Sequence, residues 1–536
     1  MKLQMKFLSS IFFSVAFILL STLGGSASST AQTHSTQNSL VLMCLSAHPD
    51  DEDGATLAYY GKLKGVKTYS IFYTRGEGGQ NEIGSELGEE LGILRTGETL
   101  EAAKILGTEV YFLGFPDFGF SKTSKETFST WGGEDAVLAR VVYIIRALKP
   151  DIIITNHDTI TTKPKRQHGN HQVVGITAYE AFEKAADPNY HPEQLRNGLD
   201  IWHVKKLFFR FRQDSTHLND STVNIDVFRN DTTGTTIKQI AENALRKHRS
   251  QGMGNITISN RRYFLARSDG HFPFDKDDLF SGIIPSSRMI ASIDTSILER
   301  ESFSPLISSE NMIGKTGPLK FKAPTQIFVG LVKTYDNTLE EFLKSYKIKY
   351  ELLDSNLLAA GELRKYTTII LDLRTYAYRL DAIQHNDKLL AYAHDGGNLV
   401  CFYHKIDDWN GKNFAPYPIL LTSERVTEEH ASVTVLLPHH PLLTKPNPIN
   451  VEDWNRWVQE RSLYLPGEDT LQTSAKYERL LAMSDSDEHQ PSTSLLWARY
   501  GKGSYTYVSL VLYRQLRIMQ DGAVKLFLNI ISQSAQ

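Results

Sequence analysis

The segment Leu40–Glu52 constrains the fold more than any other part of the chain, because a short apolar run ends abruptly in charged side chains. Its sequence is LVLMCLSAHPDDE, so one imidazole and three carboxylates follow the apolar residues. A continuous apolar run of this length is typical of a buried strand in a parallel sheet. Ligands of open α/β sheets bind just beyond the carboxyl ends of such strands. We therefore expect His48 and Asp51 at a ligand-binding edge of a sheet.

A second polar cluster, RQHGNH at residues 166–171, follows another apolar run at residues 150–156. Two imidazoles and one carboxylate form a common catalytic zinc set that leaves a coordination position for water, whereas structural zinc sites are closed and usually rich in cysteine. The simpler alternative is a chain turn in which Asp50 or Asp51 caps a helix that begins at about residue 53. The presence of both clusters favours a metal site.

The two clusters together resemble the LmbE-like or PIG-L-type zinc N-deacetylases, which carry AHPDDE after the first strand and a later HxxH. Both motifs occur here in that order, at residues 47–52 and 168–171. The resemblance covers residues 38–290, and weaker matches lie at 74–79, 95–98, 113–117 and 248–251. It implies a hydrolase that removes an acetyl group from an N-acetylated amino sugar.

The resemblance also implies a role for each residue of the site. His48, Asp51 and His171 would hold Zn²⁺, which polarises the acetamide carbonyl and activates a water molecule. Asp50 does not bind the metal in the family pattern and would act as general base. His168 would stabilise developing charge or protonate the departing amine, and the alternative is a structural histidine beside the metal.

Four further residues are candidates for contacts with the substrate. Arg166 stands where some family members have a tyrosine, so it would stabilise the tetrahedral intermediate or grip an acidic group of the substrate. Arg95 and Asp117 match positions that contact the sugar in the family, although an ion pair with Glu98 on a helix surface is the simpler account of Arg95. Arg75 lies in a glycine-rich loop after a predicted strand and is a pocket candidate.

The first 31 residues are predicted to be a signal peptide. Lys2 and Lys6 precede the apolar run Phe7–Leu23, and small residues follow as far as Ala31. This layout is typical of secretory signals, and the apolar run is shorter than the roughly 20 residues of a spanning helix. An uncleaved membrane anchor is the alternative. We therefore expect an exported protein, either periplasmic or secreted.

A chain of 536 residues is expected to form at least two domains. Residues 38–295 alternate strand and helix patterns, which predicts a Rossmann-like, mostly parallel α/β sheet. Residues 296–322 contain Ser, Pro and Gly and are interpreted as a linker. Residues 323–536 restart the alternation and predict a second α/β domain, flavodoxin-like and faintly similar to class I glutamine amidotransferases. No glycine follows Cys401, the candidate nucleophile of such a domain, so this domain is predicted to be non-catalytic.

Short apolar runs predict the strands of both domains, at 40–45, 67–73, 109–113, 151–155 and 205–211 and then at 327–332, 350–353, 368–373 and 398–403. A helix is expected over 235–249. Helical spacing of apolar residues predicts the buried side of another helix, formed by Leu87, Leu91, Leu94, Leu100, Ala103 and Leu106.

Composition argues against two classes of partner. The formal net charge of −3 gives no support to nucleic-acid binding, and the loop at 74–79 lacks the lysine of a phosphate loop, which disfavours nucleotides.

The cysteines, Cys44 and Cys401, fall in different predicted domains, so no disulfide is expected. Trp409, Trp454 and Trp457 are candidates for a carbohydrate-binding surface, with core packing as the alternative.

These patterns predict an exported zinc-dependent amidohydrolase that acts on an N-acetylated amino sugar or glycoconjugate. Two alternatives stay open: a carbohydrate-binding protein that retains a deacetylase-like domain, and an amidase for a thiol-sugar conjugate or an acylated small molecule. Ligand types alone do not separate zinc from iron or cobalt. Contact with a membrane is expected only through an uncleaved signal segment.

Overall fold

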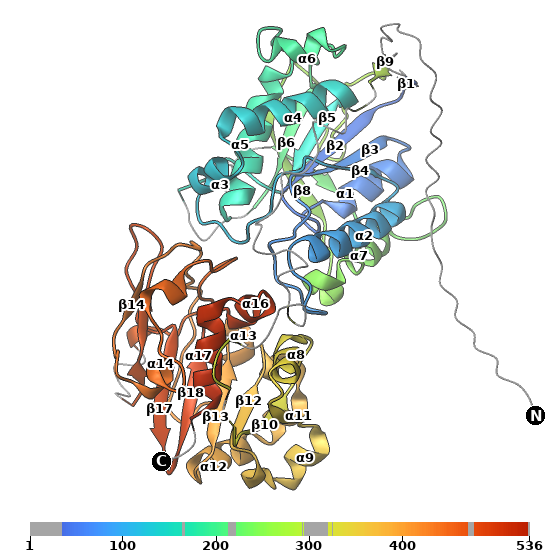
Figure 1. Cartoon of the computed structure of the whole chain (residues 1–536). Helices are drawn as coiled ribbons and strands as arrows, with labels where there is room; N and C mark the ends of the chain where they lie inside the picture. The colour runs from blue at the N-terminus through green and yellow to red at the C-terminus, as the bar shows by residue number, and fades with distance from the viewer. Residues whose placement is uncertain are drawn as a thin grey trace, which may run out of the picture.

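The computed structural model describes residues 35–162, 167–212, 221–291, 293, 313, 320–323, 325–469 and 476–533. Each half of the sequence forms a seven-stranded sheet with helices on its faces (Figure 1). The predicted class, two α/β units with largely parallel sheets, is confirmed. Within the described residues, no helix combines the length and the apolar character that a membrane crossing requires.

The first sheet has the strand order β4-β3-β2-β5-β6-β8-β7 and is parallel from β4 to β6. Strands β8 and β7 extend it in antiparallel fashion. The strands are β2 (Val41–Ser46), β3 (Lys67–Phe72), β4 (Glu109–Phe112), β5 (Ile152–Thr155), β6 (Lys206–Arg210), β7 (Thr222–Ile225) and β8 (Arg261–Ser268).

Two layers of helices cover this sheet (Figure 1), because the central strand β2 buries side chains on both faces. Val41 and Met43 pack with α4 and α5, whereas Leu42 and Cys44 pack with α1 and α7 on the opposite face. The helices of the first half are α1 (Gly54–Ala58), α2 (Glu89–Leu106), α3 (Ser124–Thr130), α4 (Glu134–Leu148), α5 (Gly169–Lys184), α6 (Pro192–Arg196) and α7 (Ile237–Leu245), with single turns η1 (Tyr59–Leu63), η2 (Arg249–Gln251) and η3 (Met253–Asn255).

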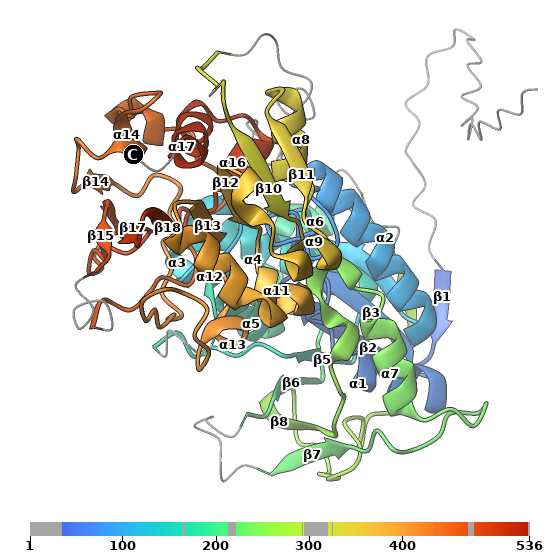
Figure 2. The ribbon, with the colours of Figure 1, turned by 90° about the horizontal axis from the view of Figure 1, so that it is seen from below.

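The second sheet has the order β11-β10-β12-β13-β18-β17-β15 and is parallel from β11 to β18. Its first five strands follow the flavodoxin-like order, and Figure 2 shows this unit in front of the first. The strands are β10 (Phe328–Val332), β11 (Lys349–Leu352), β12 (Thr368–Leu371), β13 (Asn398–Phe402), β15 (Glu478–Arg479), β17 (Leu495–Tyr500) and β18 (Gly503–Val508).

Short helices surround the second sheet, and two small antiparallel pairs complete the described secondary structure. The helices and single turns are α8 (Thr338–Ser345), α9 (Ser355–Ala360), η6 (Leu363–Lys365), α10 (Thr375–Tyr378), α11 (Leu380–Gln384), α12 (Asn386–His394), α13 (Ile406–Trp409), α14 (Pro441–Thr444), η7 (Val451–Trp454), α16 (Leu512–Arg517) and α17 (Asp521–Ile531). The pairs are β1 (Ser35–Asn38) with β9 (Ser287–Ile290) and β14 (Val433–Val435) with β16 (Leu481–Met483).

The predicted strands agree with the observed ones to within one or two residues at each end. The helix expected over 235–249 is shorter, because a capping box formed by Thr236 and Gln239 starts it and it ends at Leu245. The predicted buried side of α2 is partly wrong. Leu100 is 54% exposed, since the buried side of this helix carries Arg95 and Glu98 instead of a continuous apolar stripe.

The tryptophans proposed for a carbohydrate-binding surface are all buried. Trp409, Trp454 and Trp457 pack inside the two hydrophobic cores of the second unit, so the surface prediction is wrong and core packing is correct.

Cys44 and Cys401 are buried free thiols, as predicted. Burial raises the pKa of the Cys401 thiol to about 12, which keeps it protonated and unreactive at neutral pH.

Two predicted segments lie outside the described residues. They are the signal peptide, residues 1–31, and nearly all of the linker, residues 296–322. The domain boundaries at 38–295 and 323–536 therefore stay predictions.

Candidate active site

The turn between β2 and α1 carries three of the predicted site residues. The Asp51 backbone N–H donates to the His48 carbonyl oxygen at 3.2 Å, and Asp51 Oδ2 accepts the His48 backbone N–H at 2.9 Å. Asp50 has a φ of 86°, a left-handed value that is uncommon for a non-glycine residue. Backbone strain of this kind clusters at functional sites, where the surrounding structure holds it in place.

The helix α1 is capped by Asp53, whose side chain accepts the Thr56 backbone N–H at 3.1 Å. The alternative in which Asp50 or Asp51 caps this helix is therefore wrong. Both of these carboxylates line a pocket instead.

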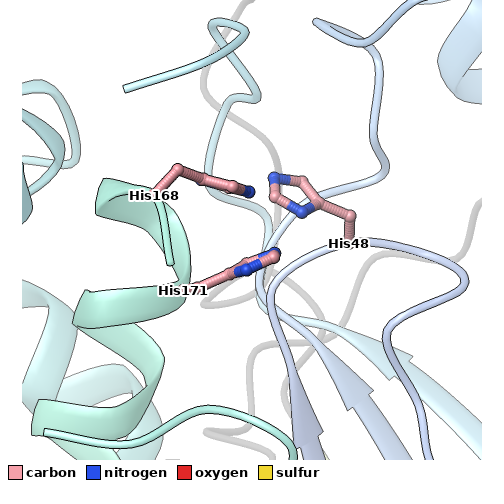
Figure 3. Close-up of side chains that lie close together, drawn as sticks. All are labelled: His48, His168 and His171. Carbon is pink, nitrogen blue, oxygen red and sulfur yellow. The ribbon is translucent and has the colours of Figure 1, made fainter. Parts of the chain in front are cut away.

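The N-terminal end of α5 brings two histidines to this turn (Figure 3). His168 is the N-cap residue of α5 and His171 lies in its first turn, with their ring centroids 3.7 Å apart. The Asp51 Oδ2 atom lies 3.1 Å from His48 Nδ1 and 3.1 Å from His171 Nε2. Figure 3 shows the rings of His48, His168 and His171 pointing toward one another. The fold thus joins the two sequence clusters in one site.

A further histidine, His157, belongs to the same cluster but was missed by sequence reasoning. It is buried shortly after the end of β5, with Nε2 3.9 Å from Asp51 Oδ2 and its ring centroid 4.2 Å from that of His171. Burial and the nearby His171 lower the pKa of His157 well below its ordinary value, so its ring is neutral. The sequence did offer one indication of His157, which is its position just beyond a predicted strand, where ligands of open α/β sheets bind.

The donor atoms of this cluster fit a divalent metal ion of the catalytic type. Among the described residues, two groups of three have ligand atoms within 4.8 Å of one another. One group is His48, His168 and His171, and the other is Asp51, His157 and His171. The predicted set of His48, Asp51 and His171 combines members of both groups. Imidazole and carboxylate without cysteine are the ligands of catalytic, not structural, zinc sites.

The two predicted acid-base residues have shifted pKa values. Burial raises the pKa of Asp50 well above its ordinary value, and the neighbouring negative charge of Asp51 adds to this. Burial lowers the pKa of His168 well below its ordinary value, and His171 adds to that shift. Strongly shifted pKa values of buried groups in a pocket are typical of functional sites.

The segment at residues 248–251 holds the turn between β2 and α1 in place through hydrogen bonds. The buried ring of His248 places Nε2 3.0 Å from Glu52 Oε1, and Glu52 Oε2 accepts the Asp50 backbone N–H at 3.0 Å. Gln251 Nε2 donates to the Pro49 carbonyl oxygen at 2.6 Å. These hydrogen bonds support the strained backbone at Asp50. The segment that makes them, residues 248–251, is one of the weaker matches to the family pattern.

Two of the substrate-binding candidates line the pocket. Arg95 is buried and donates to the carbonyl oxygens of Gly76 at 2.5 Å and Gln80 at 2.7 Å. The explanation of Arg95 as part of a surface ion pair with Glu98 is wrong, because both side chains are buried. Asp117 is also buried, with Oδ2 3.9 Å from His48 Nε2.

The other two candidates are not among the described residues that line the pocket. Arg75 points to α2, where its Nε donates to Thr96 Oγ1 at 2.8 Å. Arg166 lies outside the described residues.

The pocket has a volume of about 330 Å³ and is lined by both halves of the chain. Its lining residues from the first half are His48, Asp50, Asp51, Gly78, Gly79, Gln80, Glu82, Arg95, Asp117, Gly119, Phe120, His168, His171 and Gln251. Its lining residues from the second half are Lys405, Arg425, Glu460 and Arg514. No motif in the sequence pointed to these four.

Comparison with known proteins finds a family match within the first half of the chain. Residues 43–182 match the family model described as PIG-L: GlcNAc-PI de-N-acetylase. The diacetylchitobiose deacetylase of Thermococcus kodakarensis is 25% identical over 216 residues, which cover 39% of this chain and 69% of that protein. The 1D-myo-inositol 2-acetamido-2-deoxy-alpha-D-glucopyranoside deacetylase 2 of Saccharopolyspora erythraea is 31% identical over 184 residues, or 31% of this chain and 64% of that protein. The chain thus spans about two thirds of the length of these relatives.

A similar solved structure is that of N,N'-diacetylchitobiose deacetylase from Pyrococcus horikoshii complexed with its inhibitor MPG, which is 25% identical. That match covers 40% of this chain and 71% of the other, with a TM-score of 0.31. The family match ends at residue 182 and gives no support to the amidotransferase-like resemblance of residues 323–536. Residues 43–182 are a PIG-L/LmbE-like deacetylase domain.

Proposed function

We propose that the protein is an exported zinc-dependent N-deacetylase that acts on an N-acetylated amino sugar or glycoconjugate. One observation carries the proposal: Asp51 Oδ2 lies 3.1 Å from a ring nitrogen of both His48 and His171, beyond the carboxyl end of β2. The relatives named above support the reaction, since their names describe deacetylases of a diacetylated chitobiose and of an acetamido-glucopyranoside.

His48, Asp51 and His171 are the proposed zinc ligands, and His157 packs against His171. When bound, Zn²⁺ supplies a Lewis acid that polarises the acetamide carbonyl. Metal ligation requires the neutral form of each ligating imidazole, so metal binding releases any proton that these rings carry.

Asp50 is the proposed general base. It lines the pocket on the strained turn and is held there by the hydrogen bond from its backbone N–H to Glu52. From this position its carboxylate takes a proton from the attacking water, and the resulting carboxylic acid passes it to the leaving nitrogen. His168 lines the same pocket, where its ring stabilises the charge that develops on the carbonyl oxygen.

Export is supported by the N-terminal composition, with two lysines before the apolar run Phe7–Leu23. A second candidate function is hydrolysis of a small soluble amide conjugate. The similarity to the Saccharopolyspora enzyme, whose name describes an acetamido-sugar joined to inositol, favours that candidate over recognition without catalysis.

Metal content and amine release together test the proposed reaction. The purified protein is depleted of metal, restored with Zn²⁺, Fe²⁺ or Co²⁺, and assayed for free amine from N-acetylglucosamine oligomers. We expect activity only after restoration, and highest with Zn²⁺. Asp50→Asn should keep the zinc and lose turnover, whereas His171→Ala should lose both.

A matched control is His203→Ala, because His203 is an exposed histidine outside the metal cluster and its loss should change neither measurement. Full activity in the depleted protein would contradict the proposal, as would saccharide binding without any amine release.

A further inference from the structure

The second half of the chain contributes residues to the pocket and is joined to the loops around it by ion pairs. The carboxylate of Glu82, in the loop after β3, accepts hydrogen bonds from Arg374 Nη1 at 2.7 Å and Lys405 Nζ at 2.9 Å. Elsewhere along the contact, Lys122 Nζ lies 2.7 Å from Asp485 Oδ2. These ion pairs join pocket loops of the first unit to the second unit, which makes the second unit part of the pocket wall.

The two walls of the pocket differ in charge. The wall from the first half carries four carboxylates and one guanidinium, from Asp50, Asp51, Glu82, Asp117 and Arg95. The wall from the second half carries three cationic groups and one carboxylate, from Lys405, Arg425, Arg514 and Glu460. A proposed metal site thus faces a basic surface across the same pocket.

The basic wall keeps excess positive charge after its internal pairing. Glu460 is shared by two arginines, at 3.0 Å from Arg425 Nη1 and 3.2 Å from Arg514 Nη1. Glu82 is likewise shared by Arg374 and Lys405. Arg374 also pairs with Asp408, at 2.8 Å between Nε and Oδ2, so the charges around Glu82 are balanced. Positive charge is in excess only at Glu460, where one carboxylate contacts two guanidinium groups.

Arg425 is the member of this wall that is best placed for a ligand. Its guanidinium lies 4.3 Å from the centroid of the Phe120 ring, and that ring lies 5.1 Å from the ring of His168. Its side chain is 16% exposed, whereas that of Arg514 is 1% exposed and serves to hold Glu460. A planar guanidinium one aromatic ring away from His168 suits a carboxylate or a phosphate, which it can bind through two parallel hydrogen bonds.

The segment that carries Glu460 is built with strained backbone. Gln459 and Glu460 are consecutive non-glycine residues with φ values of 52° and 78°, and Arg456 and Tyr464 also have positive φ. Gln459 Nε2 donates to the Glu77 carbonyl oxygen of the first unit at 3.3 Å. Strain of this kind persists where the surroundings over-determine it, often at ligand clamps.

We propose that the second unit forms the substrate-recognition wall of this pocket and that Arg425, supported by Arg514 and Lys405, binds an anionic substituent of the N-acetylated sugar. The anion is a carboxylate or a phosphate ester. This inference rests on the proposed deacetylase function and narrows its substrate class. A neutral chitobiose would form no ion pair with Arg425.

The test compares neutral and anionic substrates of the same size on the full-length protein. The carboxylate arm pairs N,N'-diacetylchitobiose with N-acetylglucosamine linked to a uronic acid, and the phosphate arm pairs N-acetylglucosamine with its 6-phosphate. We expect at least one anionic compound to be preferred by about tenfold or more in kcat/KM, mainly through a lower KM that rises with salt. The preferred arm identifies the anion.

Arg425→Gln should reduce this preference to near one, and Lys405→Gln, at a partly exposed position, should reduce it several-fold if the first variant does not fold. Arg364→Gln is the matched control, because Arg364 is 85% exposed and its removal changes the net charge equally. It should keep the full preference. Equal kcat/KM values in both arms, or a preference that survives both wall variants, would overturn the inference.

Calorimetric binding to the full-length Asp50→Asn protein separates this inference from the proposed reaction. Tighter binding of an anionic sugar that Arg425→Gln abolishes would support the basic wall even if no compound released an amine. Amine release from all compounds alike would instead support the reaction and refute the role of the wall.

Discussion

Gly175 provides a sharp test of how the site is held together. It lies one helical turn after His171 on α5, where a Cβ atom would stand 2.1 Å from the carbonyl oxygen of Asp158 and 2.4 Å from its carbonyl carbon. Asp158 directly follows His157, so the backbone contact at Gly175 sets the distance between the two segments that carry these histidines. Because the obstructing atoms are backbone, no side-chain rotation can make room.

The magnitude follows from this contact. Real Cβ atoms essentially never approach another heavy atom more closely than 3.0 Å, so Gly175→Ala must move α5 away by about 1 Å. Metal–ligand distances tolerate only about 0.2 Å, and a misplacement of about 1 Å in an active site costs on the order of 100-fold in rate. Overpacking also costs about 1–3 kcal/mol of unfolding free energy.

We therefore expect Gly175→Ala to lower amine release on the order of 100-fold, weaken zinc binding and reduce the melting temperature. The matched control is Gly97→Ala on α2, where an added Cβ meets nothing within 4 Å. This control should keep its activity and gain up to about 1 kcal/mol of stability from the helix propensity of alanine. Normal zinc content, turnover and melting temperature in Gly175→Ala would refute the reasoning.

Three further predictions concern pH, metal affinity and metal removal. Burial lowers the pKa of His404 to about 3, and its Nε2 accepts the Tyr376 backbone N–H at 3.1 Å. The unfolded chain protonates this ring below about pH 6.5, so its contribution is complete above that pH and is lost as pH falls toward 3. Between pH 7.5 and 5.0, denaturant unfolding should show a loss of unfolding free energy that is about 2 kcal/mol larger in wild type than in His404→Gln, and equal losses would contradict this. His157→Ala should weaken zinc binding about 10- to 100-fold in a metal titration, and an unchanged affinity would exclude a role at the metal. A chelator should abolish amine release until Zn²⁺ is added back, whereas activity that persists in the chelator would count against a metal enzyme.

The strands that position the site could be predicted from the sequence because the central parallel strands bury both faces. The strand Val41–Ser46 is apolar as far as Leu45, and charged residues follow it closely, so the sequence predicted both the strand and the end at which the site lies. The antiparallel strand Arg261–Ser268 was missed, since it is half exposed and mixes arginines with aromatic residues.

Other features of the site depend on contacts that no local pattern encodes. The buried side of α2 holds Arg95 and Glu98, whose polar partners lie far away in the sequence, and this breaks the apolar periodicity. Arg425 and Glu460 lie outside regular helices and strands and reach the pocket only through the packing of the two units. Such long-range placement requires the tertiary structure.

The left-handed backbone at Asp50 decides which substitution can reveal its chemistry. Asparagine tolerates positive φ better than most residues and has nearly the shape of aspartate, so it should preserve the turn and remove only the titratable group. Alanine would bring a steric conflict of its own, and an inactive alanine variant would confuse damaged architecture with lost proton transfer.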